Sequence, residues 1–215
     1  MATVKPKRRY DSSGRQAQAR RTREAILDAA QRQFLDGGYA ATTIAAVAAE
    51  AGVSVETIYK AFGGKPGLVR AIYDRGLAGQ EPIPAFQRAD AIRERETDPR
   101  AIMRNWGVLT SEVSSAVSPI LLLVRSAAAS DVDMAALLEA SNAIHEERAR
   151  HHARFLKRRG YLREGVSLAQ ATDILWTCTS DELYDLLVTQ RGWSRPRFAR
   201  FLADFMIAAL LPPAH

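Results

Sequence analysis

The sequence predicts an all-α protein with a small N-terminal helical domain and a larger C-terminal helical bundle. Strand-type alternation of apolar and polar residues is nowhere sustained, whereas Ala and Arg, which favour helices, are abundant. A polar stretch containing Pro82, Pro84 and Pro99 separates the two parts, which we place at residues 14–78 and 79–215. The 215 residues are enough to bury a substantial core.

A basic arm precedes the first helix. Residues 1–23 contain eight Lys and Arg side chains and one Asp, a local balance of +7, whereas the whole chain carries +6. Residues 1–13 offer little apolar surface, so we expect them to be disordered. Such an arm suits a polyanionic partner such as nucleic acid, and a solvated tail without a partner is the alternative.

The first helix is expected from about Gly14 to Asp36, ended by Gly37 and Gly38. Thr43 to Glu50 predicts a second, short helix that Thr42 or Thr43 caps. Gly52 suits the tight turn that follows, because it adopts a left-handed backbone without strain. Ser54 then caps a third helix. Two short helices across such a turn form a helix-turn-helix, whose second helix fits the DNA major groove.

The stretch from Ala25 to Ile72 resembles the DNA-binding domain of the TetR family of bacterial transcription regulators. The residues that carry the resemblance are Phe34, Gly37-Gly38-Tyr39, Gly52-Val53-Ser54, Tyr59, Phe62, Lys65 and Leu68. Two positions depart from the family pattern, since Ala61 stands where a histidine is frequent and Gly63-Gly64 loosens the joint before the next helix.

The resemblance implies a three-helix, homeodomain-like fold that acts as a homodimer, binds a palindromic double-stranded DNA operator and releases it when a small-molecule effector binds. Matching positions and exposed faces assign DNA contacts to Thr43, Ser54, Val55, Glu56, Thr57, Tyr59, Lys60 and Lys65. Thr43 and Lys65 are expected at helix N-termini, where free N–H groups favour phosphate.

A fourth helix is expected from Lys65 and Pro66, since proline at the first helical position loses no hydrogen bond. Further helices are predicted over residues 85–96, 99–117, 119–130, 133–159, 167–190 and 197–211. Pro119 is expected to begin a new helix, because proline breaks a helix interior. The last two helices have broad apolar faces that a four-helix dimer interface would bury.

Arg125 stands out in the apolar run ILLLVRSAAAS, because a buried arginine is costly unless it is paired. It either makes an internal salt bridge, extends to solvent, or anchors an acidic group of a small ligand. Large aromatic side chains at helical spacing from polar ones serve first as core and could also line an effector cavity. The expected pocket residues are Trp106, Thr110, Leu122, Arg125, Trp176, Thr177 and Tyr184.

Several other functions find no support in the sequence. Gly63-Gly64-Lys65 lacks the spacing of a phosphate-binding loop, and the helix at His145 lacks the second histidine of a zinc protease. Cys178 has no disulfide partner or activating neighbour, which suits a reducing cytoplasm. No apolar run approaches the roughly 20 residues of a membrane span. We therefore expect no catalysis, metal, cofactor or membrane.

The sequence thus predicts a ligand-responsive, TetR-like DNA-binding regulator, most often a repressor in that family. A DNA-binding repressor or architectural factor without an effector is one alternative. An α-helical enzyme with a coincidental corner motif is the other.

Overall fold

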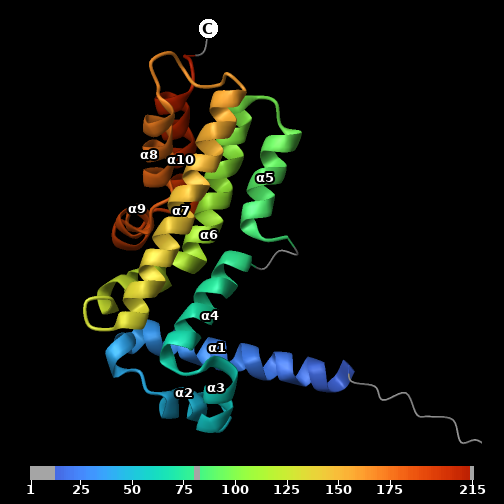
Figure 1. The fold of residues 1–215 in the computed structure, drawn as a ribbon, viewed down its shortest axis with the longest axis vertical. Helices are drawn as coiled ribbons and strands as arrows, with labels where there is room; N and C mark the ends of the chain where they lie inside the picture. Colours follow the sequence, from blue (N-terminus) through green and yellow to red (C-terminus); the bar gives the residue numbers. More distant parts are fainter. Residues whose placement is uncertain (1–12, 80–82, 214–215) are drawn as a thin grey trace, which may run out of the picture.

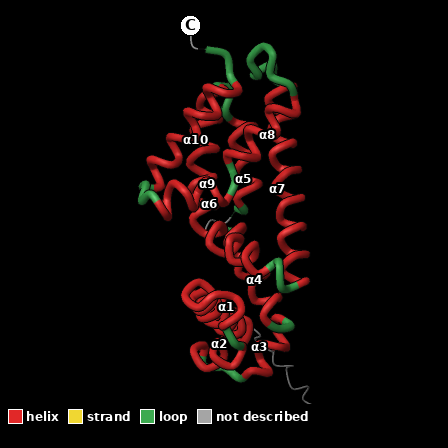
Figure 2. The backbone as a smooth tube through the Cα atoms, turned by 90° about the vertical axis from the view of Figure 1, so that its left-hand side faces the viewer, coloured by secondary structure: helices red, strands yellow, loops and turns green. Residues whose placement is uncertain are grey.

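The computed structural model describes residues 13–79 and 83–213, and within them every regular element is helical, which confirms the all-α fold class. A small head of three helices lies at one end of an elongated molecule, and α4 leads from it into a bundle (Figures 1 and 2). The head consists of α1 (Ser13–Ala41), α2 (Ile44–Ala51) and α3 (Val55–Phe62). The remaining elements are α4 (Lys65–Ala78), α5 (Ala85–Arg95), α6 (Pro99–Ala127), α7 (Val132–Arg158), α8 (Leu168–Cys178), α9 (Asp181–Tyr184), the π-helix η1 (Asp185–Gln190) and α10 (Arg195–Leu210).

Thr43 and Ser54, which were expected to cap helices in the head, are the N-caps of α2 and α3. The Ala46 N–H donates to Thr43 Oγ1 at 3.1 Å at the start of α2, and the Thr57 N–H donates to Ser54 Oγ at 3.2 Å at the start of α3. Gly52 has a φ of 67°, the left-handed conformation that its turn requires. The predicted helix-turn-helix is therefore confirmed.

The end of the first helix differs from its prediction. Helical hydrogen bonding continues to Ala41, but Gly38 has a φ of 80° and a ψ of 167°, so the chain kinks at the expected glycine. Thr42 is buried beyond the kink, and its hydroxyl donates to the Gly38 carbonyl at 2.9 Å. Thr43, not Thr42, is the cap of α2.

The prediction that Pro119 begins a new helix is wrong, because Pro119 lies inside the 29-residue helix α6. Proline removes one backbone hydrogen bond, which normally bends or ends a helix. Here Val117, Ile120 and Val124 are buried on either side of it, against the head and α7. Tertiary packing therefore keeps the two halves of α6 continuous.

The single helix predicted over residues 167–190 is also wrong, since α8 ends at Cys178. The Thr179 hydroxyl donates to the Leu175 carbonyl at 2.9 Å, and Ser180 Oγ accepts the Leu183 N–H at 3.3 Å as the cap of α9. Side chains that bond to the local backbone compete with a continuing helix. The chain then turns through α9 into η1.

The apolar core extends from the head into the bundle. Phe34, Ile58 and Leu68 belong to the same buried cluster as Ile120 of α6 and Met134 of α7. A second cluster fills the bundle between α5, α6, α7, α8 and α10. The division at residue 79 remains a prediction, and apolar contact is continuous between its two parts.

Helix α6 is the central helix of the bundle and packs against most of the others. By length and composition it is apolar enough to cross a membrane, but half of its most apolar window is buried inside the protein. It packs along α10 so closely that a Cβ at Gly107 would lie 2.5 Å from the Ala199 carbonyl oxygen. The apolar run that suggests a span is therefore accounted for by this central position.

Candidate nucleic-acid interface and ligand cavity

The exposed face of α3 is the surface of the helix-turn-helix that points away from the core. Tyr59 is 54% exposed and Val55 40% exposed, whereas Ile58 on the opposite face is fully buried. Glu56 and Lys60 are also exposed, and Thr57 is half-buried. An exposed tyrosine beside polar side chains on a short helix suits contact with a groove.

The hydroxyls at the two helix N-termini already have partners within the protein. Thr43 and Ser54 accept backbone N–H groups as caps, and Ser54 Oγ lies 2.9 Å from Thr57 Oγ1. Both caps are exposed. They orient the first turns of α2 and α3, whose remaining free N–H groups point outward.

Lys65, which we expected to face phosphate, is folded back onto the head. Its ammonium lies 4.5 Å from the centroid of the Tyr39 ring and donates to the Ala40 carbonyl at 3.4 Å. The Tyr39 hydroxyl donates to Asp131 Oδ2 at 2.9 Å, and Asp131 caps α7. Burial and this hydrogen bond raise the pKa of Tyr39. Sequence reasoning missed this link between the reading head and the corner of α6 and α7.

Arg75 connects α4 to α1 through three hydrogen bonds. Its guanidinium donates to Asp28 Oδ1 at 2.7 Å, Glu24 Oε2 at 3.1 Å and Gln31 Oε1 at 2.7 Å. Three acceptors from successive turns of α1 match the fork of one arginine. These contacts join α4 to α1 of the head.

A cavity of about 230 Å³ lies inside the bundle next to α4. Its wall is mostly apolar and includes Leu109, Val113, Val117, Leu121, Leu175 and Met206. Tyr73 and Leu77 of α4 line the same cavity. The helix that begins beside α3 therefore forms part of the cavity wall.

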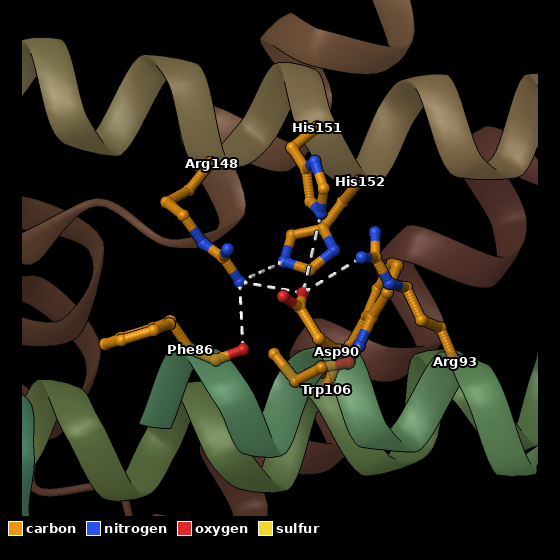
Figure 3. A network of polar contacts seen from close by, with 8 residues as sticks. Phe86, Asp90, Arg93, Trp106, Arg148, His151 and His152 are labelled. Atoms are coloured by element: carbon orange, nitrogen blue, oxygen red, sulfur yellow. Dashed lines mark hydrogen bonds and ion pairs between the residues drawn. The ribbon is translucent and has the colours of Figure 1, made fainter. Parts of the chain in front are cut away.

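The cavity wall formed by α5 is fastened to α7 through a polar cluster around Asp90 (Figure 3). One Asp90 oxygen, Oδ1, lies 3.2 Å from Arg148, 3.4 Å from Arg93 and 3.5 Å from His151. Arg148 also donates to the Phe86 carbonyl at 3.1 Å. Although burial on its own would raise the pKa of Asp90, the hydrogen bond and charge of Arg148 outweigh it, so the pKa is lowered.

His152 stands between this cluster and the core. Its ring centroid is 4.3 Å from that of Trp106, and Arg148 Nη2 lies 3.4 Å from its Nε2. The Trp106 indole N–H donates to the Ala89 carbonyl of α5 at 3.2 Å. Burial, with the charges of Arg148 and Arg93, lowers the pKa of His152 to about 3, so the ring is neutral.

A second polar group in the cavity lies near α4 and α9. Asp181 lines the cavity and accepts a hydrogen bond from Ser118 Oγ at 2.7 Å. Burial raises the pKa of Asp181, and the charge of Glu182 adds to this, whereas Ser118 and Arg125 oppose it. Burial and the charge of Asp181 raise the pKa of Tyr73 to about 12.

His145 also lines this wall and stacks on Trp176, with ring centroids 5.7 Å apart. Its Nε2 is hydrogen-bonded to Thr179 Oγ1. Because the Thr179 hydroxyl donates to the Leu175 carbonyl, the imidazole is the donor in this pair. Burial lowers the pKa of His145, which therefore presents a neutral ring.

The structure brings only part of the expected pocket together. Trp106 and Thr110 line the cavity, while Leu121 lines it in place of the expected Leu122. Arg125, Trp176, Thr177 and Tyr184 lie outside the lining.

The four expected pocket residues that lie outside the cavity lining are exposed or packed elsewhere in the protein. Arg125 is about half exposed and pairs with Glu182, which is the salt-bridge alternative for this residue. Trp176 and Thr177 are exposed on α8, and Tyr184 packs edge-on against Phe198. Although the run around Arg125 is apolar, α6 turns Arg125 and Ser126 to solvent.

The described residues show no site for a metal or a reactive thiol. No three of their His, Cys, Asp and Glu side chains lie close enough to hold a metal ion. Cys178 is buried, which raises the pKa of its thiol to about 12 and keeps it protonated.

Comparisons with known proteins agree with this arrangement. Residues 26–72 match the sequence family of bacterial regulatory proteins named tetR. The HTH-type transcriptional regulator TtgR of Pseudomonas putida is 39% identical over 87 residues. That match spans 40% of this chain and only 40% of the length of TtgR.

Solved structures extend the similarity of fold to most of the chain. The SmeT–triclosan complex superposes with a TM-score of 0.69 at 23% identity, covering 89% of this chain and 92% of that one. NalD, the secondary repressor of the MexAB-OprM multidrug efflux pump in Pseudomonas aeruginosa, has a TM-score of 0.68 at 19% identity, covering 91% and 98%. Residues 26–72 therefore match the tetR family of bacterial regulatory proteins, and most of the chain shares its fold with these solved structures.

Proposed function

We propose that the protein is a DNA-binding transcription repressor that binds a palindromic operator as a homodimer and releases it when a small molecule occupies the cavity. The exposed face of α3 on a tetR-type head is the observation that carries DNA binding. The proposed contacts are Thr43, Ser54, Val55, Glu56, Thr57, Tyr59 and Lys60 on α2 and α3, with Lys65 at the start of α4.

Helix α4 is the proposed connection between ligand and DNA. It begins at Lys65 beside Tyr39, is tied to α1 through Arg75, and lines the cavity with Tyr73 and Leu77. A ligand changes DNA affinity only by preferring one arrangement of the heads, and the coupling is reciprocal. Such coupling is about 1–3 kcal/mol, or roughly 5- to 150-fold in affinity.

An exposed aromatic face supports the homodimer. Phe201 is 36% exposed and Phe205 45% exposed on α10, next to Trp193, and Leu186 of η1 is 49% exposed. Large apolar side chains gathered on one face mark an interaction site. Pairing of α10 and the preceding helical segment with those of a second copy would bury them. Two recognition helices would then read half-sites about 34–36 Å apart, or a multiple of that.

The proposed function is tested by selecting genomic DNA fragments with the purified protein and sequencing them. We expect one inverted-repeat sequence to be enriched, and light scattering should give the mass of a dimer. Enrichment without sequence preference would instead favour an architectural factor.

The released state is tested by fluorescence anisotropy on the selected DNA. A cavity-binding molecule is expected to weaken the complex, and the protein–DNA complex should in turn bind that molecule more weakly. The cavity wall formed by α4 favours this over a repressor without an effector. A molecule that binds the cavity and leaves DNA affinity unchanged would contradict the effector step alone. We also propose that this regulator is cytoplasmic and has no catalytic activity.

A further inference from the structure

Asp181, the acidic group of the cavity, is partly buried and makes few polar contacts within the protein. Ser118 donates to Asp181 Oδ1, and among the described residues Oδ2 receives no hydrogen bond and neither oxygen has a cationic partner within salt-bridge distance. The nearest arginine of α6, Arg125, is paired with Glu182 at the surface. A charged carboxylate taken out of water is costly without a partner. Asp181 therefore has unused capacity to pair with a positive charge.

The rest of the wall is short of positive charge. Arg148 is the one Lys or Arg among the described lining residues, and it is already engaged by Asp90 and the Phe86 carbonyl. The histidines of the wall are neutral, since burial lowers the pKa of both His145 and His152. Among the charged side chains of the described wall, Arg148 is paired with Asp90 whereas Asp181 has no cationic partner, which favours a cation over an anion.

The remaining lining suits a small molecule with an aromatic or aliphatic body. The aromatic residues Trp106 and Phe86 line the cavity, and Leu109, Val113 and Met206 extend its apolar surface. The volume of about 230 Å³ lies just below the roughly 300–1,000 Å³ of drug-sized sites. Tyr73 stands near Asp181, and its ring can face a cation.

We propose that the cavity is selective for small amphipathic cations, with an amine pairing with Asp181 and an apolar body lying among Trp106, Phe86 and the aliphatic residues. This inference rests on the proposed function and specifies the chemical class of its effector. Because Tyr73 of α4 lies next to Asp181, the bound charge contacts the helix that connects to the DNA-reading head. Burial raises the pKa of Asp181, which agrees with a carboxyl group that has no close cationic partner.

Three small molecules that share a phenylbutyl group and differ in charge test whether ligand charge affects binding. Phenylbutylamine is a cation near pH 7, phenylbutanol is neutral and phenylbutyrate is an anion. Their dissociation constants are measured by calorimetry on the full-length protein. We expect the amine to bind about tenfold tighter than the alcohol, and the carboxylate to bind weakest.

Asp181→Asn removes the charge and keeps an acceptor for Ser118. In this variant we expect the amine and the alcohol to bind with similar affinity, and the alcohol to bind as in the wild type. Asp173→Asn is the matched control, because Asp173 is exposed on α8 and does not line the cavity. It should leave the preference for the amine unchanged.

Several results would overturn the inference. These are equal binding of amine and alcohol to the wild type, a preference that survives Asp181→Asn, or tightest binding by phenylbutyrate, which would assign the anchor to Arg148. If the alcohol alone binds and weakens the DNA complex, the proposed function stands and only the cationic class is wrong. If none of the three binds, both the cavity as a ligand site and the cationic class are refuted, while selected DNA still tests the reading head.

Discussion

Lowering the pH from 7 to 5 should destabilise the fold through His152. The Nδ1 atom of this ring is buried, and no described residue accepts or donates a hydrogen bond there. Its Nε2 faces the guanidinium of Arg148 at 3.4 Å. Protonation would add an N–H at Nε2, facing the Arg148 guanidinium, and would place a charge in a buried site. Burial first, and then the charges of Arg148 and Arg93, therefore lower the pKa of His152 to about 3.

The sign of the effect follows from the two pKa values. The unfolded chain takes up a proton as the pH falls through about 6.5, whereas the folded protein does so only near 3. Between these values the unfolded state binds more protons, so the free energy of unfolding falls by about 1.4 kcal/mol per pH unit. Over the interval from pH 7 to pH 5 the loss from His152 is about 2 kcal/mol.

Urea unfolding at pH 7 and pH 5 measures this loss, with His152→Phe as the comparison. Phenylalanine keeps a ring against Trp106 but cannot titrate. The lowered pKa values of His145 and His151 contribute in both proteins and cancel in the difference. The wild type should lose about 2 kcal/mol more than the variant. Equal losses in the two proteins would refute the assignment of His152 as a buried neutral group.

Four further outcomes are expected. Tyr59→Ala should weaken binding to the selected DNA by about 1–3 kcal/mol without changing urea unfolding, since Tyr59 is exposed; unchanged affinity would remove it from the proposed DNA-binding residues. Ile58→Ala should cost about 2–5 kcal/mol of stability because the side chain is fully buried, and a loss below about 1 kcal/mol would contradict its core position. Deleting residues 1–13, most of which lie outside the described part, should lower the salt slope of DNA binding by about 0.9 for each phosphate that the arm neutralises, and an unchanged slope would show that it neutralises none. Gly107→Ala should destabilise the protein by about 1–3 kcal/mol, because its Cβ would lie 2.5 Å from the Ala199 oxygen; wild-type stability would show that α6 and α10 separate there without cost.

The DNA-reading head was largely predictable from the sequence because its signals are local. A cap forms between residues three apart, as with Ser54 and Thr57, and the turn at Gly52 depends on one residue's own φ. The face of α3 follows from helical periodicity, which places Ile58 inside and Tyr59 outside. None of these features requires knowledge of a distant segment.

The cavity was less predictable, because its wall combines side chains from six helices and one short turn of helix. Trp106 and Thr110 were expected there, but Asp181 and His152 were not, and nothing local marks them as neighbours. Ser180 followed by two acidic residues is a helix-start signal that could have placed the break after α8. The link from Tyr39 to Asp131 joins residues 92 apart, so no periodic pattern reports it.

By itself, the sequence determined the helical class, the helix-turn-helix and the family that residues 26–72 match. These depend on short-range backbone preferences, and on a spacing of apolar residues that each helix carries within itself. The tertiary structure decided that α6 continues through Pro119, that Arg125 faces solvent, and that Asp181 lies in the cavity. These outcomes depend on which helix surfaces pack against one another in the folded protein. The free energy of that packing can outweigh a local signal such as a proline, and the sequence of one helix does not show which distant helix will cover it.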